Sequence, residues 1–182
     1  TILVEQDQGI RDSTMEGLAK LKPVMEGQIH TAGNSSQITD GAAAVLWMSE
    51  EKAKALGLRP RARILCDVLV GTDPYYLLDG PVDATRRILD KTGMKFGDID
   101  LYEINEAFSA QYLACEKELG LDRDKCNVNG GAVSIGHPLG ATGTRLVLTL
   151  MHQLERGDGA LGMASACIGG GQGIAMLIER VA

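Results

Sequence analysis

The chain has 182 residues, of which 45% are hydrophobic and 23% are charged, with a formal net charge of −6 and a pI near 5.1. This is the composition of a globular protein, and no apolar run approaches the ~18 residues that a membrane-spanning helix needs. The acidic balance excludes a general nucleic-acid surface, because phosphate binding requires clustered Lys and Arg. We therefore expect a soluble protein with one compact domain, or with one domain and part of another.

The first residues, Thr1 to Glu5, include no initiator Met, basic stretch or apolar leader. We therefore expect the sequence to begin in the middle of a longer chain. The cysteines at positions 66, 115, 126 and 167 form no CxxC pair and no His/Cys ligand spacing. This spacing argues against a metal site and favours reduced thiols in a cytoplasmic protein.

In chain order, residues 1–40 are polar and turn-rich, residues 41–48 form an apolar run, and a helix is predicted from Ser49 to a stop at Gly57. Beyond Pro60 the pattern predicts strands at 61–70, 99–104, around Val128, 161–167 and 173–179, and helices at 81–92, 108–119 and 138–156. This βαβαβαββ order predicts a layered α/β fold, with a mostly buried sheet between helices.

Three short segments place polar side chains just after predicted strands or before a helix, where α/β sheets bind ligands. They are 105–108 (Asn-Glu-Ala-Phe), 136–143 (Gly-His-Pro-Leu-Gly-Ala-Thr-Gly) and 167–171 (Cys-Ile-Gly-Gly-Gly). Each segment also has a structural interpretation. Asn105 suits a helix N-cap, a lone His before Pro is often structural, and a Cys ending an apolar strand is usually buried packing. Together they favour a site, and we expect Asn105, His137 and Cys167 to converge on one side of the sheet.

The chemistry of these residue types suggests distinct roles. His137 would be the N-cap of the long helix, with Pro138 at its first position, so that the helix dipole disfavours the imidazolium and a neutral ring can donate one N–H to an oxyanion. Cys167 adjoins three glycines whose backbone N–H groups would favour a thiolate able to act as a base. Asn105 can hold a water or a carbonyl. We expect His30 and His152 to be simply solvated, and the Gly136/Gly140/Gly143 spacing to serve a turn and close helix packing rather than a nucleotide.

The order of Asn-Glu-Ala-Phe, Gly-His-Pro-Leu-Gly and Cys-Ile-Gly-Gly-Gly resembles the signature set of the thiolase family, and Thr-Ala-Gly-Asn-Ser-Ser at 31–36 resembles another stretch of that family. The resemblance implies that Cys167 is the acid/base and that His137, with a water on Asn105, binds the thioester oxygen. It also implies a second oxyanion hole at the Gly169 N–H. Substrate and coenzyme A contacts are implied at Ala32, Gly33, Ser36, Ala107 and Phe108.

The resemblance also implies that the family's nucleophilic cysteine lies upstream of this chain, because Cys66, Cys115 and Cys126 occupy no comparable motif. Residues 1–60 would then be the tail of the N-terminal and loop region, and 61–182 the C-terminal domain. The implied activity is acyl-CoA C-acyl transfer, by Claisen condensation or thiolysis of 3-ketoacyl-CoA. No cofactor beyond the coenzyme A thioesters is implied, and the family's usual assembly is a homo-oligomer.

The missing nucleophile leaves other functions open. We expect the isolated chain to be inactive, and its partner to be an N-terminal half supplied in cis or as a separate subunit. The alternative is a non-catalytic thiolase-like module that binds acyl-CoA or lipid or acts as a scaffold, and a Cys/His hydrolase is a more distant third.

Overall fold

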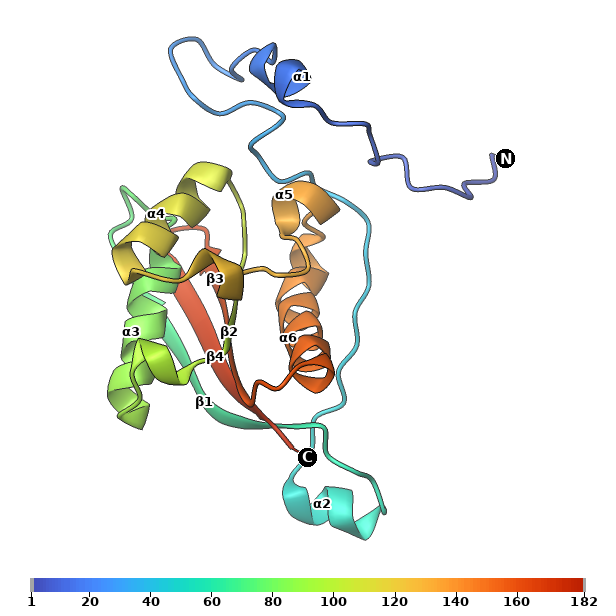
Figure 1. The fold of residues 1–182 in the computed structure, drawn as a ribbon, viewed down its shortest axis with the longest axis vertical. Helices are drawn as coiled ribbons and strands as arrows, with labels where there is room; N and C mark the ends of the chain where they lie inside the picture. The colour runs from blue at the N-terminus through green and yellow to red at the C-terminus, as the bar shows by residue number, and fades with distance from the viewer. Residues whose placement is uncertain (1, 182) are drawn as a thin grey trace.

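A four-stranded mixed sheet forms the centre of the protein, in a computed structural model that describes residues 2–181 (Figure 1). The strand order is β1-β4-β3-β2, where β1 is Ala62–Gly71, β2 is Leu101–Ile104, β3 is Leu161–Ile168 and β4 is Gln172–Arg180. Only β2 and β3 pair in parallel; β3–β4 and β4–β1 are antiparallel. The predicted α/β fold is therefore confirmed.

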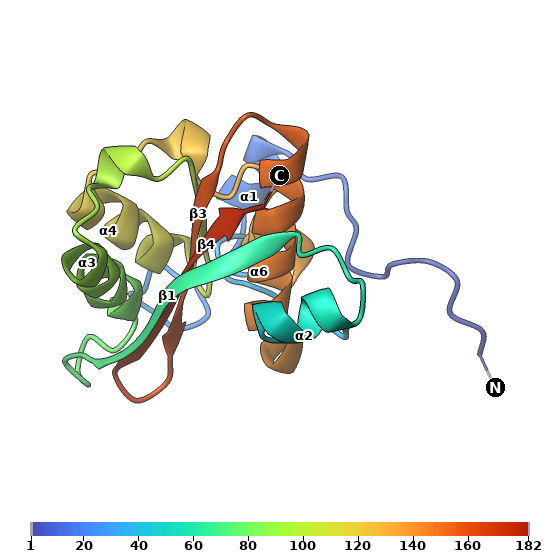
Figure 2. The same ribbon diagram turned by 90° about the horizontal axis from the view of Figure 1, so that it is seen from below.

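Helices cover both faces of this sheet, as Figures 1 and 2 show. Helices α3 (Gly80–Thr92) and α4 (Ser109–Leu119) lie on one side, and α6 (Leu139–Arg156) lies on the other. The larger core lies under α3 and includes Val68, Ile88, Ile104, Met163 and Leu177. The second lies under α6 and includes Leu146, Leu150, Leu154, Ala164 and Ile178.

The long helices form where the sequence predicts them, because their signals are local. Helix α6 places Leu146, Leu150 and Leu154 at a helical spacing, and all three are buried against the sheet. Helix α3 has a proline in its first turn and ends at Gly93, whose φ of 71° lies in the left-handed region that favours glycine.

The strand predicted around Val128 is wrong. Residues 126–129 form one parallel bridge, Tyr102↔Cys126, and then turn, with Asn127 at a φ of 46°. The Asn127 side chain makes the backbone hydrogen bonds that a neighbouring strand would make. Its Oδ1 accepts from the Ile104 N–H at 2.8 Å, and its Nδ2 donates to the Ile104 C=O at 2.9 Å. Because one amide side chain pairs with both the N–H and the C=O of Ile104, no further strand pairs with this edge of β2.

The segment between α3 and α6 contains three short elements that no pattern predicted. They are the 3-10 helices Phe96–Asp98, just before β2, and Arg123–Lys125, and the single helical turn α5 (Ala132–Ile135). Gly136 follows α5 at a φ of 93°, and a Cβ there would overlap Thr39. This glycine allows the sharp turn that leads into α6.

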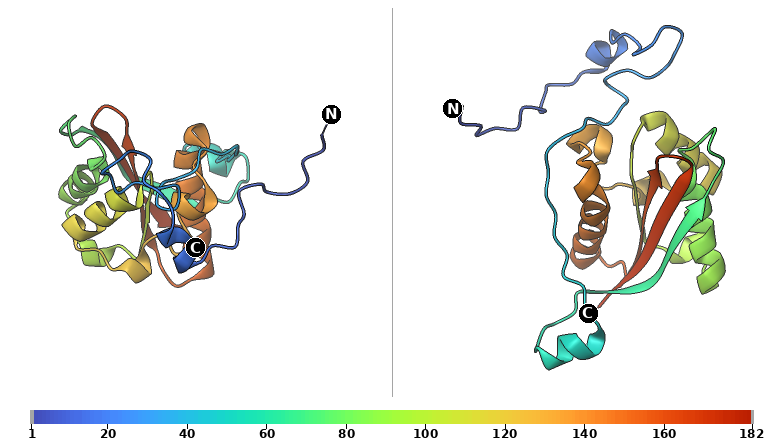
Figure 3. Two further views of the ribbon diagram at one scale, coloured as in Figure 1. Left: turned by 90° about the horizontal axis from the view of Figure 1, so that it is seen from above. Right: turned by 180° about the vertical axis from the view of Figure 1, so that it is seen from behind.

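Residues 2–61 lie outside the helix-covered sheet: the first part projects from it, and the later part runs alongside α6 to α2 (Figures 1 and 3). They contain α1 (Met15–Ala19) and α2 (Glu50–Ala55), and the predicted start of α2 is confirmed because the Ser49 side chain caps it. The segment exposes apolar side chains, including Ile2, Ile10, Met15, Ile38 and Leu46. No helix within residues 2–181 is long and apolar enough to cross a membrane.

Candidate active site

Asn105 lies at the carboxyl end of β2, and only 1% of its surface is exposed. Its backbone N–H donates to the Ser165 carbonyl of β3 at 2.9 Å, so it sits where the two parallel strands end. The N-cap interpretation is wrong, because α4 begins at Ser109 and its N-cap is Phe108. The side-chain Oδ1 is buried and has no hydrogen-bond partner among residues 2–181. A buried acceptor without a partner is costly and indicates a bound water or ligand.

His137 reaches Asn105 from the other side of the site. Its Nε2 lies 3.3 Å from Asn105 Nδ2, and its backbone N–H donates to the Gln37 carbonyl at 2.8 Å. His137 is not the N-cap of α6; the helix begins at Leu139 and its N-cap is Pro138, in an extended conformation. Burial, and then the charge of Arg145, lower the pKa of His137. The neutral ring therefore follows from burial and a nearby cation rather than from the capping position.

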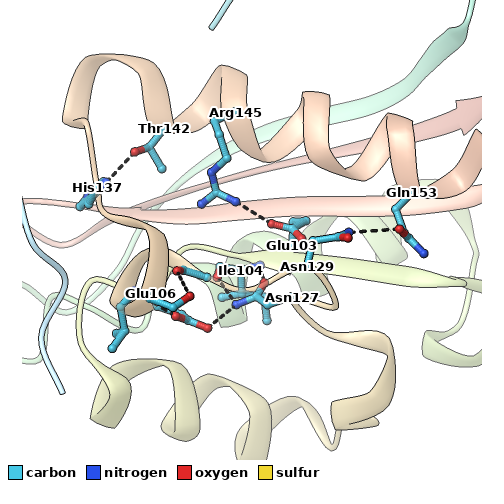
Figure 4. A network of polar contacts seen from close by, with 12 residues as sticks. Glu103, Ile104, Glu106, Asn127, Asn129, His137, Thr142, Arg145 and Gln153 are labelled. Carbon is cyan, nitrogen blue, oxygen red and sulfur yellow. Dashed lines mark hydrogen bonds and ion pairs between the residues drawn. The ribbon is translucent and has the colours of Figure 1, made fainter. Parts of the chain in front are cut away.

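Thr142, in the first turn of α6, contacts the other ring nitrogen (Figure 4). Its Oγ1 lies 2.6 Å from His137 Nδ1 and donates to the Pro138 carbonyl at 3.0 Å. Thr142 is 3% exposed, so its hydroxyl has these protein partners in place of bulk water. The sequence motif contained this residue, but the pattern gave it no role.

A buried ion pair lies behind His137 between the sheet and α6. Arg145 Nη1 donates to Glu103 Oε2 at 2.9 Å, and Glu103 is 2% exposed. Burial raises the pKa of Glu103 to about 7, against the opposing effect of Arg145. Arg145 also lines a pocket of about 180 Å³ with Pro138 and residues 39–43. Sequence reasoning missed this pair, although a carboxylate inside a short apolar strand was the available signal.

Glu106, the charged member of the Asn-Glu-Ala-Phe segment, holds the loop beside the site. Its Oε1 accepts from Asn127 Nδ2 at 2.8 Å and its Oε2 accepts from the Val133 N–H at 3.1 Å. A Cβ at Gly131 would overlap this carboxylate, so glycine is required for the close approach. Glu106 therefore fixes the loop 127–133 to the end of β2, as Figure 4 shows.

Cys167 lies near the carboxyl end of β3, two residues beyond Ser165. Ala164 and Ala166 face α6, so the alternation along the strand turns Cys167 toward the α3 and α4 side. Asn105 contacts His137 directly, and the convergence of Cys167 with these two side chains stays a prediction. Burial raises the pKa of Cys167, so the resting group is a thiol, not the thiolate that the glycine run suggested.

The glycine turn after β3 is open. Gly169 is exposed, and a Cβ built there would meet no atom within 4 Å. Gly170 and Gly171 have φ values of 86° and 79°, which require glycine-like freedom. The Gly169 backbone is therefore accessible for a ligand, as its proposed role needs.

The residues suggested for substrate contact come together from two distant segments. The Ser36 N–H donates to the Ala107 carbonyl at 3.0 Å, and the Ser109 N–H donates to the Asn34 carbonyl at 2.9 Å. Ala32 and Gly33 lie in the adjoining turn, exposed and half-buried respectively.

The two remaining histidines are not simply solvated. The half-buried His30 ring packs on Phe108 at a centroid distance of 4.7 Å. His152 Nδ1 lies 3.0 Å from Arg61 Nη2, in a surface network that includes Glu155. The prediction of a solvated side chain is wrong for His30; the His152 side chain is 41% exposed, as predicted, and also contacts these charged neighbours.

These contacts define an α/β protein with hydrogen-bonding groups gathered at the carboxyl edge of its parallel strands. Residues 58–180 match the family model of the thiolase C-terminal domain, and residues 1–51 match that of the thiolase N-terminal domain. The chain belongs to the thiolase family.

Curated and solved relatives support the same conclusion. The acetyl-CoA acetyltransferase of Pseudomonas aeruginosa is 54% identical over 92% of this chain and 43% of its own length. The crystal structure of the Bacillus anthracis acetyl-CoA acetyltransferase has a TM-score of 0.93 and 50% identity, covering 97% of this chain and 45% of that one. That of human mitochondrial 3-ketoacyl-CoA thiolase in complex with CoA has a TM-score of 0.90 and 44% identity, covering 98% and 46%. The chain thus spans about half the length of these relatives.

Proposed function

We propose that this chain supplies the acid/base and oxyanion-binding part of an acyl-CoA C-acyltransferase, acting by Claisen condensation or by thiolysis of 3-ketoacyl-CoA. The observation that carries the proposal is the buried, unpartnered Oδ1 of Asn105 beside the neutral ring of His137. Asn105 Oδ1 can only accept, so it would hold a water that donates to the thioester oxygen, beside the ring of His137 and away from bulk water. The solved thiolase with bound CoA supports coenzyme A as the ligand.

In this proposal Cys167 exchanges a proton with the α-carbon of the acetyl group. As a thiol it protonates the departing acetyl enolate; as a thiolate it removes the α-proton in the reverse direction. The raised pKa of Cys167 favours the thiol, so the cleavage direction begins with the group already protonated. The Gly169 N–H would bind the second oxyanion, and the path of the substrate would run along Ser36, Ala32, Gly33, Ala107 and Phe108.

The nucleophile belongs to the N-terminal half, which we propose is joined in cis or bound as a separate subunit. A homo-oligomer, a cytoplasmic location and the absence of any cofactor beyond the coenzyme A thioesters remain predictions. The chain alone should not turn over acetoacetyl-CoA, because Cys66, Cys115 and Cys126 occupy no motif like that of the family's nucleophile. Turnover by the isolated chain that Cys66→Ala, Cys115→Ala or Cys126→Ala abolishes would show that the nucleophile is misplaced.

The decisive test uses the complete protein, with the N-terminal half present. Cys167→Ala should still form the acyl-enzyme, detected by mass spectrometry, but should lose exchange of the acetyl α-protons with deuterated solvent. His137→Ala should lose about 10²–10³ in rate, the usual cost of one oxyanion donor. Cys66→Ala, in β1, is the matched control and should keep both activities. Full proton exchange in Cys167→Ala would contradict the role of Cys167, and acyl-CoA binding without any turnover would instead indicate a binding module.

A further inference from the structure

The hydroxyl of Thr142 has two partners but only one proton to donate. The Pro138 carbonyl can only accept, and it lies 3.0 Å from Oγ1. His137 Nδ1, at 2.6 Å, can be either a donor or an acceptor. If the hydroxyl donated to Nδ1, the lone pairs of Oγ1 and of the Pro138 carbonyl would face each other without a hydrogen. Only one arrangement places a hydrogen in both contacts: the hydroxyl donates to Pro138, and Nδ1–H donates to the hydroxyl.

We propose that Thr142 is a positioning residue that holds His137 in the tautomer protonated at Nδ1, leaving Nε2 as a hydrogen-bond acceptor that faces Asn105. Burial supports this assignment, because Thr142 is 3% exposed and water does not compete for its proton. The neighbouring amide is consistent with it, since Asn105 Nδ2 lies 3.3 Å from Nε2 and can donate to it. The same Pro138 carbonyl also accepts the Ala141 N–H at 2.8 Å and the Thr142 N–H at 2.9 Å, and these bonds hold Thr142 in the first turn of α6 beside the ring.

This tautomer has a consequence for the reaction. In the resting state Nε2 has no hydrogen, so it can take a proton from a thiol in the site but cannot donate to an oxyanion. Once it has taken that proton, both ring nitrogens donate, and Nε2–H can bind the thioester oxygen. The assignment of the tautomer stands on the contacts alone; only this consequence rests on the proposed function.

The tautomer can be measured without any activity, by solid-state ¹⁵N spectra of the complete protein with labelled histidine, at a pH where the ring is neutral. The His137 signals are assigned by their loss in His137→Gln. The wild-type protein and Thr142→Ser should show Nδ1 protonated and Nε2 unprotonated, whereas Thr142→Val should shift the ring toward protonation at Nε2. Thr149→Val, two turns further along α6, is the matched control and should change nothing. A wild-type ring protonated at Nε2, or an unchanged tautomer in Thr142→Val, overturns the proposal, and the wild-type spectrum alone decides the first point.

The catalytic consequence has its own readout in the complete enzyme. Thr142→Val should lower the rate of acyl-enzyme formation about 10- to 100-fold, as removal of an orienting partner usually does, and Thr142→Ser should restore it. If Thr142→Val changes the tautomer but not the rate, the proposed role of His137 is contradicted and the tautomer assignment stands. If Thr142→Val leaves the tautomer unchanged, the assignment itself is contradicted, so the two failures can be told apart.

Discussion

The buried carboxylate of Glu103 should make the stability of the chain depend on pH in an unusual direction. Burial raises its pKa from the ordinary value of 4.5 to about 7, so the folded state binds a proton more tightly than the unfolded state does. Its contribution is therefore fully present below the unfolded pKa and is lost as the pH rises through the folded one. A change of one in pKa corresponds to about 1.4 kcal/mol, so the free energy of unfolding should fall by about 3 kcal/mol across this window.

The assay is urea unfolding at about pH 5 and about pH 8, comparing the wild-type chain with Glu103→Gln. In Glu103→Gln the free energy of unfolding should fall less between the two pH values, because glutamine has no proton to lose. The readout is this change with pH, not the absolute stability. Glu155→Gln is the control, since Arg61 lowers the pKa of that surface carboxylate and places its titration below this window. An equal fall in the wild-type chain and Glu103→Gln would refute the argument, because the slope would then come from other groups.

Three further predictions test the fold that positions the site, each by urea or thermal unfolding. Leu150→Ala, at a fully buried position of α6, should cost about 2–5 kcal/mol, whereas Leu139→Ala, at a 66% exposed position, should stay within about 0.5 kcal/mol; equal costs would contradict the packing. Asn127→Ala should cost about 1–3 kcal/mol, because it leaves the Ile104 N–H and C=O without partners, and Asn129→Ala should cost less. Gly173→Ala should prevent folding, because its Cβ would overlap the Gly80 backbone. Gly140→Ala should fold, because a Cβ there meets no atom within 4 Å. A folded Gly173→Ala would show that the start of β4 and the start of α3 can separate.

The elements that the sequence predicted correctly have local causes. The face of α6 follows from the spacing of its leucines, and the ends of α3 and α4 follow from Gly93 and Gly120, which take left-handed conformations. The predicted strand at Val128 failed for a non-local reason: the Asn127 side chain bonds to the backbone of Ile104, 23 residues earlier in the chain. A hydrophobic pattern depends only on the polarity of the side chains, so it does not predict that an asparagine side chain will make the hydrogen bonds of a neighbouring strand.

The same distinction applies to the site. The motif residues Asn105 and His137 were predictable because each stands beside a strand or helix boundary that the sequence marks. The groups that set the state of the ring were not, because their effect appears only through contacts: Thr142 lies one helical turn beyond Pro138, and Arg145 meets Glu103 across 42 residues of chain. One signal was available, since a glutamate within the short strand Leu101–Ile104 requires a cation nearby when it is buried.

The placement of Cys167 follows from sheet geometry in a way that also constrains the chemistry. Ile104 pairs with Ser165 in the parallel register, so Asn105 lies level with Ala166, which packs against the core under α6. Cys167 is one residue further and must face the opposite layer, because side chains alternate along a strand. Because β2 ends at Ile104 while β3 continues to Ile168, Cys167 lies beyond the last parallel pair, at the carboxyl edge of the sheet where the proposed substrate would have to reach both groups.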